Sequence, residues 1–377
     1  MNILFAALAL FLLYILQAAV YRKYWSRNLD IRLFYSKETC VEGEQANLVE
    51  VLTNNKRLPL PNLTVKFQTS RKLDFLQNEN SAVTDLYYRS DIFSFKDRER
   101  ITRTLPFCCK SRSYYTIDQL TVSCSDILFS QKYHETRKIF TQLYVYPKYV
   151  DIRKLLIPFN QLYGMILANR HFYEDPFEFR SIREYQPFDP MRAVNWKAFA
   201  RTGELMVNTY EDTASQEVCI YLNLENNGYE NHYDIMEENI RLAATLSDML
   251  IAKGIPVSLK TNGCDLITKQ PLSIPAGTGT SHQTIILQNL SRISLELPVE
   301  HLNGLLEQDL QQNNRSPYAL VISNYCHSDF TEILKDILKS NHGSQLIYTY
   351  HRSMEHDLKL PQDVMHQVLY WEVTHID

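Results

Sequence analysis

The side chains most able to form a specific site gather in one short run, from Glu178 to Arg201. Its members with the clearest binding chemistry are Arg183, Tyr185, Asp189, Arg192, Trp196, Lys197 and Arg201. Guanidinium and ammonium groups bind carboxylates, and an indole ring offers a large apolar contact area. No nucleophile–base pair of the kind that covalent catalysis needs accompanies them. The run therefore predicts a surface that contacts an acidic partner or a facing domain.

A short helix is expected to position these side chains. Asp189 directly precedes Pro190, and this pair favours a helix start because the carboxylate accepts free N–H groups and proline fits the first turn. We expect the helix to run to Arg201 and to end at Gly203 in the left-handed conformation. Lys197 then shares a helix face with Arg201, where two like charges repel unless an anionic group lies opposite.

A purely structural role for the same residues is the competing interpretation. In that case Asp189 caps the helix, while Trp196 and the arginines dock it between two domains. Residues 205–210 then predict a strand that leads away from it.

The run resembles the signature of the domain-of-unknown-function-58 family. That signature contains E-F, R-x-Y, P-G-D, R-x-I-D-W-K and A-R in this order. The matching positions, at the same spacing, are Glu178, Phe179, Arg183, Tyr185, Pro187, Asp189, Arg192, Trp196, Lys197, Ala200 and Arg201. Two positions depart from the pattern: Phe188 replaces the glycine, and Asn195 replaces the aspartate before the tryptophan. The resemblance implies a bacterial membrane protein with a von Willebrand factor A-like domain and a MoxR-type AAA ATPase as partner.

Composition bounds the class of protein. The chain has 377 residues, enough for two or three domains, and a formal net charge of −4 that does not indicate a nucleic-acid partner. Ten glycines argue against Gly-rich phosphate loops, and no cofactor is predicted. The seven cysteines are an odd number without a C-x-x-C pair, which favours reduced thiols in the cytoplasm over disulfides or a zinc site.

The amino terminus predicts a membrane anchor. The run from Ile3 to Val20 is apolar and long enough to nearly span a bilayer core. Arg22, Lys23 and Arg27 follow it and no basic residue precedes it, so the positive-inside rule places the remainder of the chain in the cytoplasm. We expect a single-pass protein of the cell membrane with its helix over residues 1–21. A cleaved signal peptide is the alternative, but its basic leading region is missing.

Residues 28–150 predict a β-sandwich. The stretch from Leu63 to Phe67 alternates between apolar and polar residues, as a half-buried strand does. Other short strands recur at sandwich spacing. Residues 151–217 form a connector that holds the signature, and its first part, from Asp151 to Asp175, is expected to be a loop or short helices.

Residues 218–377 predict a doubly wound α/β domain, so the fold class is α/β plus all-β. The run from Val218 to Leu224 reads as a buried parallel strand, and strands and helices alternate after it. The family resemblance implies a von Willebrand factor A-like fold, which holds Mg²⁺ through D-x-S-x-S after its first strand. Asn223, Glu225 and Asn227 stand at those positions. Because hard cations need rigid carboxylate and hydroxyl oxygens, we expect no metal, or a weakly held one.

Three hypotheses follow for function. The preferred one is a non-enzymatic, membrane-anchored adaptor that helps to assemble membrane or envelope complexes. The second is a ligand- or divalent-dependent adhesion module with an altered site at Glu225 and the Asp189 loop. The third is a hydrolase that uses Asp189 or Asp175, which the missing nucleophile–base pair disfavours.

Overall fold

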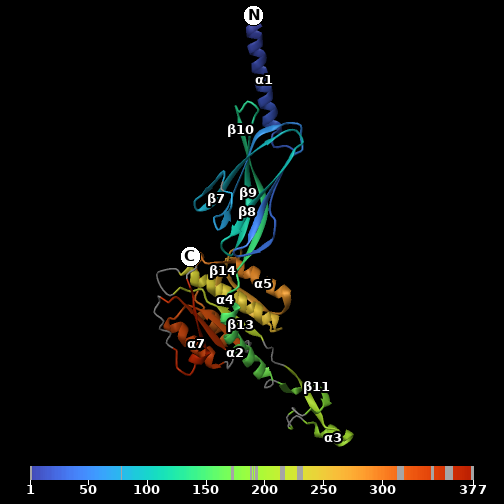
Figure 1. Cartoon of the computed structure of the whole chain (residues 1–377), viewed down its shortest axis with the longest axis vertical. Helices are drawn as coiled ribbons and strands as arrows, with labels where there is room; N and C mark the ends of the chain where they lie inside the picture. The colour runs from blue at the N-terminus through green and yellow to red at the C-terminus, as the bar shows by residue number, and fades with distance from the viewer. Residues whose placement is uncertain are drawn as a thin grey trace. The chain divides into compact units, whose positions relative to one another are not determined.

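The computed structural model describes residues 2–77, 79–170, 174–186, 189, 191, 194–212, 217–226, 232–311, 318–340, 344–352 and 360–374. Contacts divide the chain into two units, Met1–Lys148 and Tyr149–Asp377. Figure 1 shows the elements of both units. The predicted connector falls within the second unit.

The first unit begins with one apolar helix, α1 (Asn2–Tyr24). Its length and composition make it a candidate membrane span, and its apolar side chains, such as Leu8 and Phe11, are exposed. Its carboxyl end is different, because Tyr21 and the following Trp25 are buried in the core of the β-domain. The Tyr21 hydroxyl donates to the Pro59 carbonyl at 2.6 Å. The helix therefore continues directly into the folded domain that follows.

Two sheets pack around one core to form a β-sandwich. The four-stranded sheet has the order β1 (Leu29–Tyr35), β3 (Gln45–Asn54), β8 (Arg100–Cys109) and β5 (Leu73–Phe75). The six-stranded sheet has the order β2 (Thr39–Val41), β10 (Lys132–Tyr146), β9 (Ser113–Ser125), β4 (Leu60–Ser70), β7 (Leu86–Phe95) and β6 (Ser81–Val83). Leu63, Val65 and Phe67 of β4 are buried, so the inward face predicted from their alternation is confirmed.

Ionisable side chains lie between these two sheets. Arg89 and Asp91 of β7 form an ion pair with Nε and Oδ2 2.5 Å apart, and both side chains are fully buried. Arg103 of β8 approaches the other oxygen of Asp91 at 2.7 Å. Glu50 of β3 faces Arg103 across the strand pair, and neither of its carboxylate oxygens has a hydrogen-bond partner in the described part of the chain. Burial, helped by the charge of Asp91, raises the pKa of Glu50 to about 7.

The second unit contains a seven-stranded sheet. Its main order is β15 (Pro271–Gly277), β14 (Val257–Asp265), β13 (Val218–Leu222), β17 (Tyr318–Ser323), β18 (Gln345–Tyr350) and β19 (Val368–Glu372), and β16 (Ile293–Ser294) pairs with β14. Strands β14, β13, β17, β18 and β19 are parallel, and β15 and β16 each pair antiparallel with β14. Every residue of β13 is buried and both of its neighbours are parallel, which confirms the predicted buried parallel strand.

Helices cover both faces of this sheet. They are α4 (Tyr233–Ala252), α5 (Gly279–Arg292), α6 (Asn303–Gln311) and α7 (Ser328–Ser340), with a short 3₁₀ turn, η2 (Met365–Gln367). Alternate residues of β13 enter different cores: Ile220 lies in the core with α4 and α5, and Tyr221 in the core with α6 and α7. Two opposite apolar cores make the sheet doubly wound, as predicted.

The stretch from Asp151 to Asp175 was expected to be a loop or short helices. It instead contains one 19-residue helix, α2 (Ile152–Arg170), so the expected interruptions are wrong. Leu155, Phe159, Leu162 and Ile166 are buried in the core shared with α4 and α5. Their spacing of four, three and four residues makes one apolar helix stripe. This burial outweighs the helix-breaking tendency that Pro158 and Gly164 suggest in the sequence.

Candidate functional site

The signature residues lie on a hairpin within the second unit. Strand β11 (Glu174–Glu184) pairs antiparallel with β12 (Met206–Asp212), and the short helix α3 (Trp196–Thr202) lies between them in the chain. Val194 and Val207 are buried and form an isolated bridge. This bridge and the caps described next fix the position of α3 on the hairpin.

Helix α3 begins six residues later than the sequence predicts. The predicted start at Asp189 and Pro190 is wrong: Asn195 is the cap, and its Oδ1 accepts from the N–H of Ala198 at 2.9 Å. Asparagine and aspartate cap helices about equally well, so the departure of Asn195 from the family pattern preserves the cap. At the other end Gly203 adopts φ 75°, which confirms the predicted left-handed stop.

Asp189 instead closes the loop before α3. Its two oxygens lie 2.6 Å from Nη2 and Nη1 of Arg183 in a bidentate ion pair, and it also accepts from the N–H of Gln186 at 2.9 Å. The hydrogen bonds from Arg183 hold the pKa of Asp189 below its usual value. The charge of Arg183 is therefore neutralised within the loop, and Asp189 is unsuited to act as a general base.

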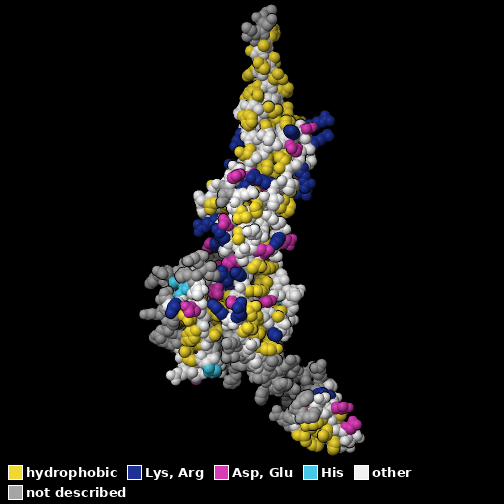
Figure 2. Space-filling model, in the orientation of Figure 1, with side chains coloured by type: hydrophobic (Ala, Val, Ile, Leu, Met, Phe, Trp, Pro, Cys, Tyr) yellow, Lys and Arg dark blue, Asp and Glu magenta, His cyan; other side chains and the backbone are white. Residues whose placement is uncertain are grey.

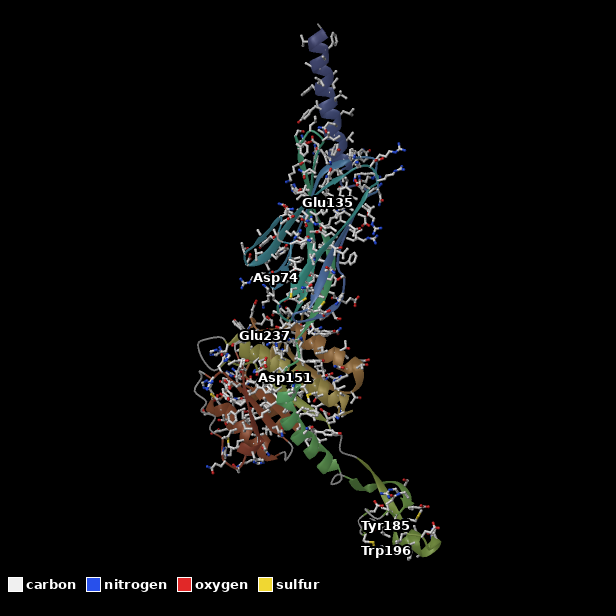
Figure 3. The ribbon with its side chains drawn as sticks, viewed as in Figure 1. Asp74, Glu135, Asp151, Tyr185, Trp196 and Glu237 are labelled. Carbon is white, nitrogen blue, oxygen red and sulfur yellow. The ribbon has the colours of Figure 1, made fainter. Side chains whose placement is uncertain are left out.

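Large apolar side chains cover the outside of this hairpin. Ile182, Met191, Trp196, Phe199 and Leu205 are all exposed, and we call them the hairpin apolar patch. Trp196 is 58% exposed and meets Phe199 edge to face, with ring centroids 6.1 Å apart. Figure 2 shows hydrophobic side chains gathered there, and Figure 3 labels Trp196 and Tyr185. Trp196 is therefore exposed on the hairpin itself.

Two cations stand beside the hairpin apolar patch. Lys197 and Arg201 are exposed on α3, and neither forms an ion pair with a described residue. Tyr185 is half-buried, and its N–H donates to the Leu205 carbonyl at 2.9 Å. Arg192 lies outside the described residues.

Phe199 and Met191 belong to the patch, although the sequence interpretation did not single them out. Phe199 falls three residues after Trp196, so helical spacing alone could have placed it beside the indole. Met191 precedes the helix, and its exposure follows from the late helix start, which the sequence does not reveal.

The second candidate site lies at the carboxyl edge of the α/β sheet. Asn223 follows β13 and Ser323 ends β17, where the strand order reverses and α/β proteins bind ligands. Asn223 is fully buried, and its Nδ2 donates to Ser323 Oγ at 3.1 Å. Its Oδ1 accepts from the N–H of Glu225 at 3.0 Å and from Asn262 Nδ2 at 2.8 Å. Both acceptor positions of this amide are therefore in use.

Glu225 is likewise held by protein donors. Its Oε1 accepts from the N–H of Leu302 at 2.7 Å and lies 3.3 Å from Asn262 Nδ2. His301 Nδ1 lies 2.8 Å from Oε2. Asn227 lies outside the described residues, and among those that are described no three His, Cys, Asp or Glu side chains gather as metal ligands. The oxygens of Asn223 and Glu225 thus do not fit a hard divalent cation, which needs uncommitted ligands.

The same polar network joins further strand ends. Asn239 of α4 is fully buried; its Oδ1 accepts from Thr349 Oγ1 at 2.6 Å, and its Nδ2 lies 3.4 Å from Asn324 Oδ1. Ser323 Oγ accepts from the N–H of Tyr325 at 2.9 Å. Buried polar networks of this kind favour one arrangement of the strands that they join.

Comparison with known proteins adds a family match. Residues 181–363 match the family model described as protein of unknown function DUF58. The "Uncharacterized protein YeaD" of Bacillus subtilis (strain 168) is 20% identical over 281 residues, which are 74% of this chain and 66% of that protein, slightly less than two thirds of its length.

Solved structures give weak likenesses. Domains D2 and D3 of the major pilin SpaD from Corynebacterium diphtheriae are 8% identical over 29% of this chain and 51% of theirs, with a TM-score of 0.22. A non-cellulosomal cohesin from Archaeoglobus fulgidus is 8% identical over 31% of this chain and 91% of its own, with a TM-score of 0.20. TM-scores this low do not identify the fold of the chain. The resemblance predicted from the Glu178–Arg201 run is confirmed as a match to the DUF58 family over residues 181–363.

Proposed function

We propose that this chain is a non-enzymatic, membrane-anchored interaction protein whose hairpin binds a protein partner. The observation that carries the proposal is the exposed Trp196–Phe199 pair on α3. Both helix caps and the Arg183–Asp189 ion pair fix this loop, yet no described residue covers the aromatic face that they present. Exposed aromatic side chains on a rigid element are typical of binding hot spots.

The chemistry of the surface defines the partner. Lys197 and Arg201 flank the aromatic pair, so the partner offers an apolar socket with carboxylates at its rim. An AAA ATPase of the MoxR type, acting in the assembly of membrane or envelope complexes, is the partner class that the family resemblance implies. The exposed apolar helix α1 supports anchoring in the cell membrane with a cytoplasmic soluble part. The strand order, equivalent to 3-2-1-4-5-6, supports a von Willebrand factor A-like domain.

The test is co-purification of tagged full-length protein from gently solubilised native membranes, with and without ATP. We expect an AAA ATPase with the wild type and its loss in the variant Trp196→Ala with Phe199→Ala, because the hot spot is removed. Lys197→Ala with Arg201→Ala should weaken capture and reduce its dependence on salt. Ile267→Ala, which truncates an exposed apolar residue between β14 and β15, is the matched control. A partner retained by the aromatic double variant would exclude this surface.

A titration with metal ions separates the adhesion alternative from the interaction protein proposed here. Titration of Mg²⁺ or Mn²⁺ into the wild type should give no saturable heat, because protein donors already occupy the Glu225 carboxylate and the Asn223 amide oxygen. Glu225→Ala should instead lower stability by about 1–3 kcal/mol, since the buried Leu302 N–H loses its acceptor. Saturable heat that disappears in Glu225→Ala would support a divalent-dependent module in place of the adaptor.

A further inference from the structure

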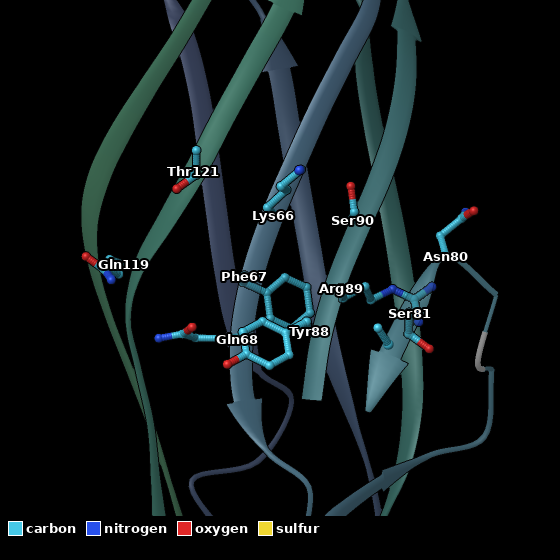
Figure 4. A pocket seen from close by; sticks show the side chains of 11 residues that line it. Lys66, Phe67, Gln68, Asn80, Ser81, Tyr88, Arg89, Ser90, Gln119 and Thr121 are labelled. Atoms are coloured by element: carbon cyan, nitrogen blue, oxygen red, sulfur yellow. The ribbon is translucent and has the colours of Figure 1, made fainter. Parts of the chain in front are cut away.

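The outer face of the six-stranded sheet carries a hollow of about 440 Å³, which we call the sheet groove. Strands β4, β7 and β9 supply most of its lining, and residues 80–82 close one side (Figure 4). Its volume lies within the ~300–1,000 Å³ range of small-molecule sites. The groove belongs wholly to the first unit, so it is separate from both candidate sites described above.

Strand pairing sets the side chains of the groove beside one another. Lys66 of β4 lies opposite Ser90 of β7 and Thr121 of β9. Gln68, two residues further along β4, lies opposite Tyr88. Directly paired residues on one face are neighbours, with Cβ atoms about 5 Å apart. Two adjacent rows of side chains therefore form the groove surface on a rigid sheet.

The groove contains polar groups that the fold does not use. Six lining side chains make no hydrogen bond to the described part of the chain: Lys66, Gln68, Asn80, Ser90, Gln119 and Thr121. Their alternation with buried neighbours, such as Phe67, turns them outward. The Tyr88 ring stands among them, with its hydroxyl 3.3 Å from Asp85 Oδ1. The result is a surface with many uncommitted donors and acceptors and one aromatic wall.

The charge of the lining limits the ligand. None of the lining residues is acidic, and Lys66 is the one exposed cation. The Arg89 guanidinium points inward, where it contacts Asp91 and Tyr87. A polyanion needs several cations, and an apolar ligand would bury these uncommitted polar groups without giving them hydrogen-bond partners. The amide and hydroxyl groups of the lining both donate and accept hydrogen bonds. They therefore match a ligand with adjacent hydroxyl groups, which also donate and accept.

We propose that the sheet groove binds a neutral polyhydroxylated ligand, namely a short oligosaccharide. Gln68, Asn80 and Gln119 bind vicinal hydroxyl pairs through their amides, and Lys66 and Thr121 bind single oxygens. The Tyr88 ring packs against the apolar C–H face of one sugar. Groups held on three paired strands need little reorganisation on binding, which favours affinity. This site gives the membrane-proximal domain a function independent of the hairpin.

The test is calorimetric titration of the full chain in detergent with maltotriose, xylotriose and tri-N-acetylchitotriose. We expect at least one of them to bind saturably, and Gln68→Ala with Gln119→Ala to weaken it about tenfold or more, because two hydrogen-bonded amides are lost. Tyr88→Ala should weaken it similarly. Gln45→Ala, at an exposed glutamine on the four-stranded sheet, is the matched control and should leave the affinity within about twofold.

Two further binding experiments identify the source of the glycan and test other classes of ligand. Vesicles with a diglucosyl lipid test whether the groove takes a lipid-linked glycan, and binding that the groove variant abolishes supports the proposal and identifies that source. Inorganic phosphate and an uncharged extended peptide test other classes. The proposal is overturned if no glycan binds, if the double variant binds as tightly as the wild type, or if phosphate or the peptide displaces the glycan completely.

Discussion

Replacing Asp91 by alanine is expected to lower the free energy of unfolding of the β-sandwich by about 3–5 kcal/mol. Asp91 forms ion pairs with Arg89 and Arg103 from the two sheets. Its removal deprives the Arg89 guanidinium, whose side chain is fully buried, of its ion-pair partner in a medium of low dielectric constant. Hydrogen exchange of β7 and β8 peptides, measured in the full chain at increasing denaturant, reports this loss locally.

Asp74→Ala is the matched control for that experiment. Asp74, labelled in Figure 3, lies 2.7 Å from Lys110 in an ion pair whose two side chains are 42% and 62% exposed. Because water screens such pairs, the expected loss is below about 1 kcal/mol. Equal losses for Asp74→Ala and Asp91→Ala would contradict a structural role for the buried pair.

Replacing Glu50 by glutamine is expected to raise the stability of the β-sandwich above pH 7 by about 3 kcal/mol. The folded protein holds the pKa of Glu50 at about 7, above the ordinary value of 4.5, because burial disfavours the carboxylate. Between these two pH values the unfolded chain loses the proton while the folded chain keeps it. The stability of the wild type therefore falls as pH rises from about 4.5 to 7, and a neutral glutamine removes this term.

The measurement is denaturant unfolding of wild type and Glu50→Gln across pH 4 to 9. The two curves should meet near pH 4 and separate up to about pH 7, after which the difference is constant. Glu44→Gln is a useful comparison, because the hydrogen bond from Lys37 lowers the pKa of Glu44 and its effect has the opposite sign. A difference between wild type and Glu50→Gln that does not change with pH would show that Glu50 is ionised in the folded state.

The sequence allowed the elements with strong periodicity to be predicted. Strand β13 was recognised from its unbroken apolar run, and β4 from strict alternation, because burial on two faces or one leaves these patterns directly in the chain. Strand β15 was missed. Its Pro271 and Pro275 argue against a strand, but it is an edge strand, where a missing N–H is tolerated.

The length of helix α2 was underestimated for a related reason, since only a loop or short helices were expected there. Pro158 and Gly164 suggested interruptions, and only tertiary burial of the stripe from Leu155 to Ile166 shows that the helix continues. The predicted start of α3 was wrong because an aspartate directly before a proline, here Asp189 and Pro190, favours a helix cap when only local sequence is considered. The Asp189 carboxylate instead forms an ion pair with Arg183, six residues earlier in the chain. Helix propensities of individual residues do not reveal pairings of this kind.

The candidate sites were predictable to different degrees. Seven candidate side chains were selected from the signature run. The structure describes six of them, all on the hairpin, and Arg192 lies outside the described residues. The exposure of Trp196 could not be derived from residue spacing. At the carboxyl edge of the sheet, Asn223 and Glu225 could be chosen from the sequence as candidate positions. Their hydrogen-bond donors Asn262 and Leu302 are distant in sequence, so only the fold reveals these contacts.

The direct passage of α1 into the β-sandwich has a mechanical consequence. Tyr21 and Trp25 lie in the sandwich core, so no flexible linker separates the helix from the domain. The tilt of a membrane helix responds to hydrocarbon thickness. When α1 is in a bilayer, a change in its tilt therefore rotates the sandwich with it as one rigid body. The orientation of the sheet groove relative to the membrane surface is then set by the lipid itself.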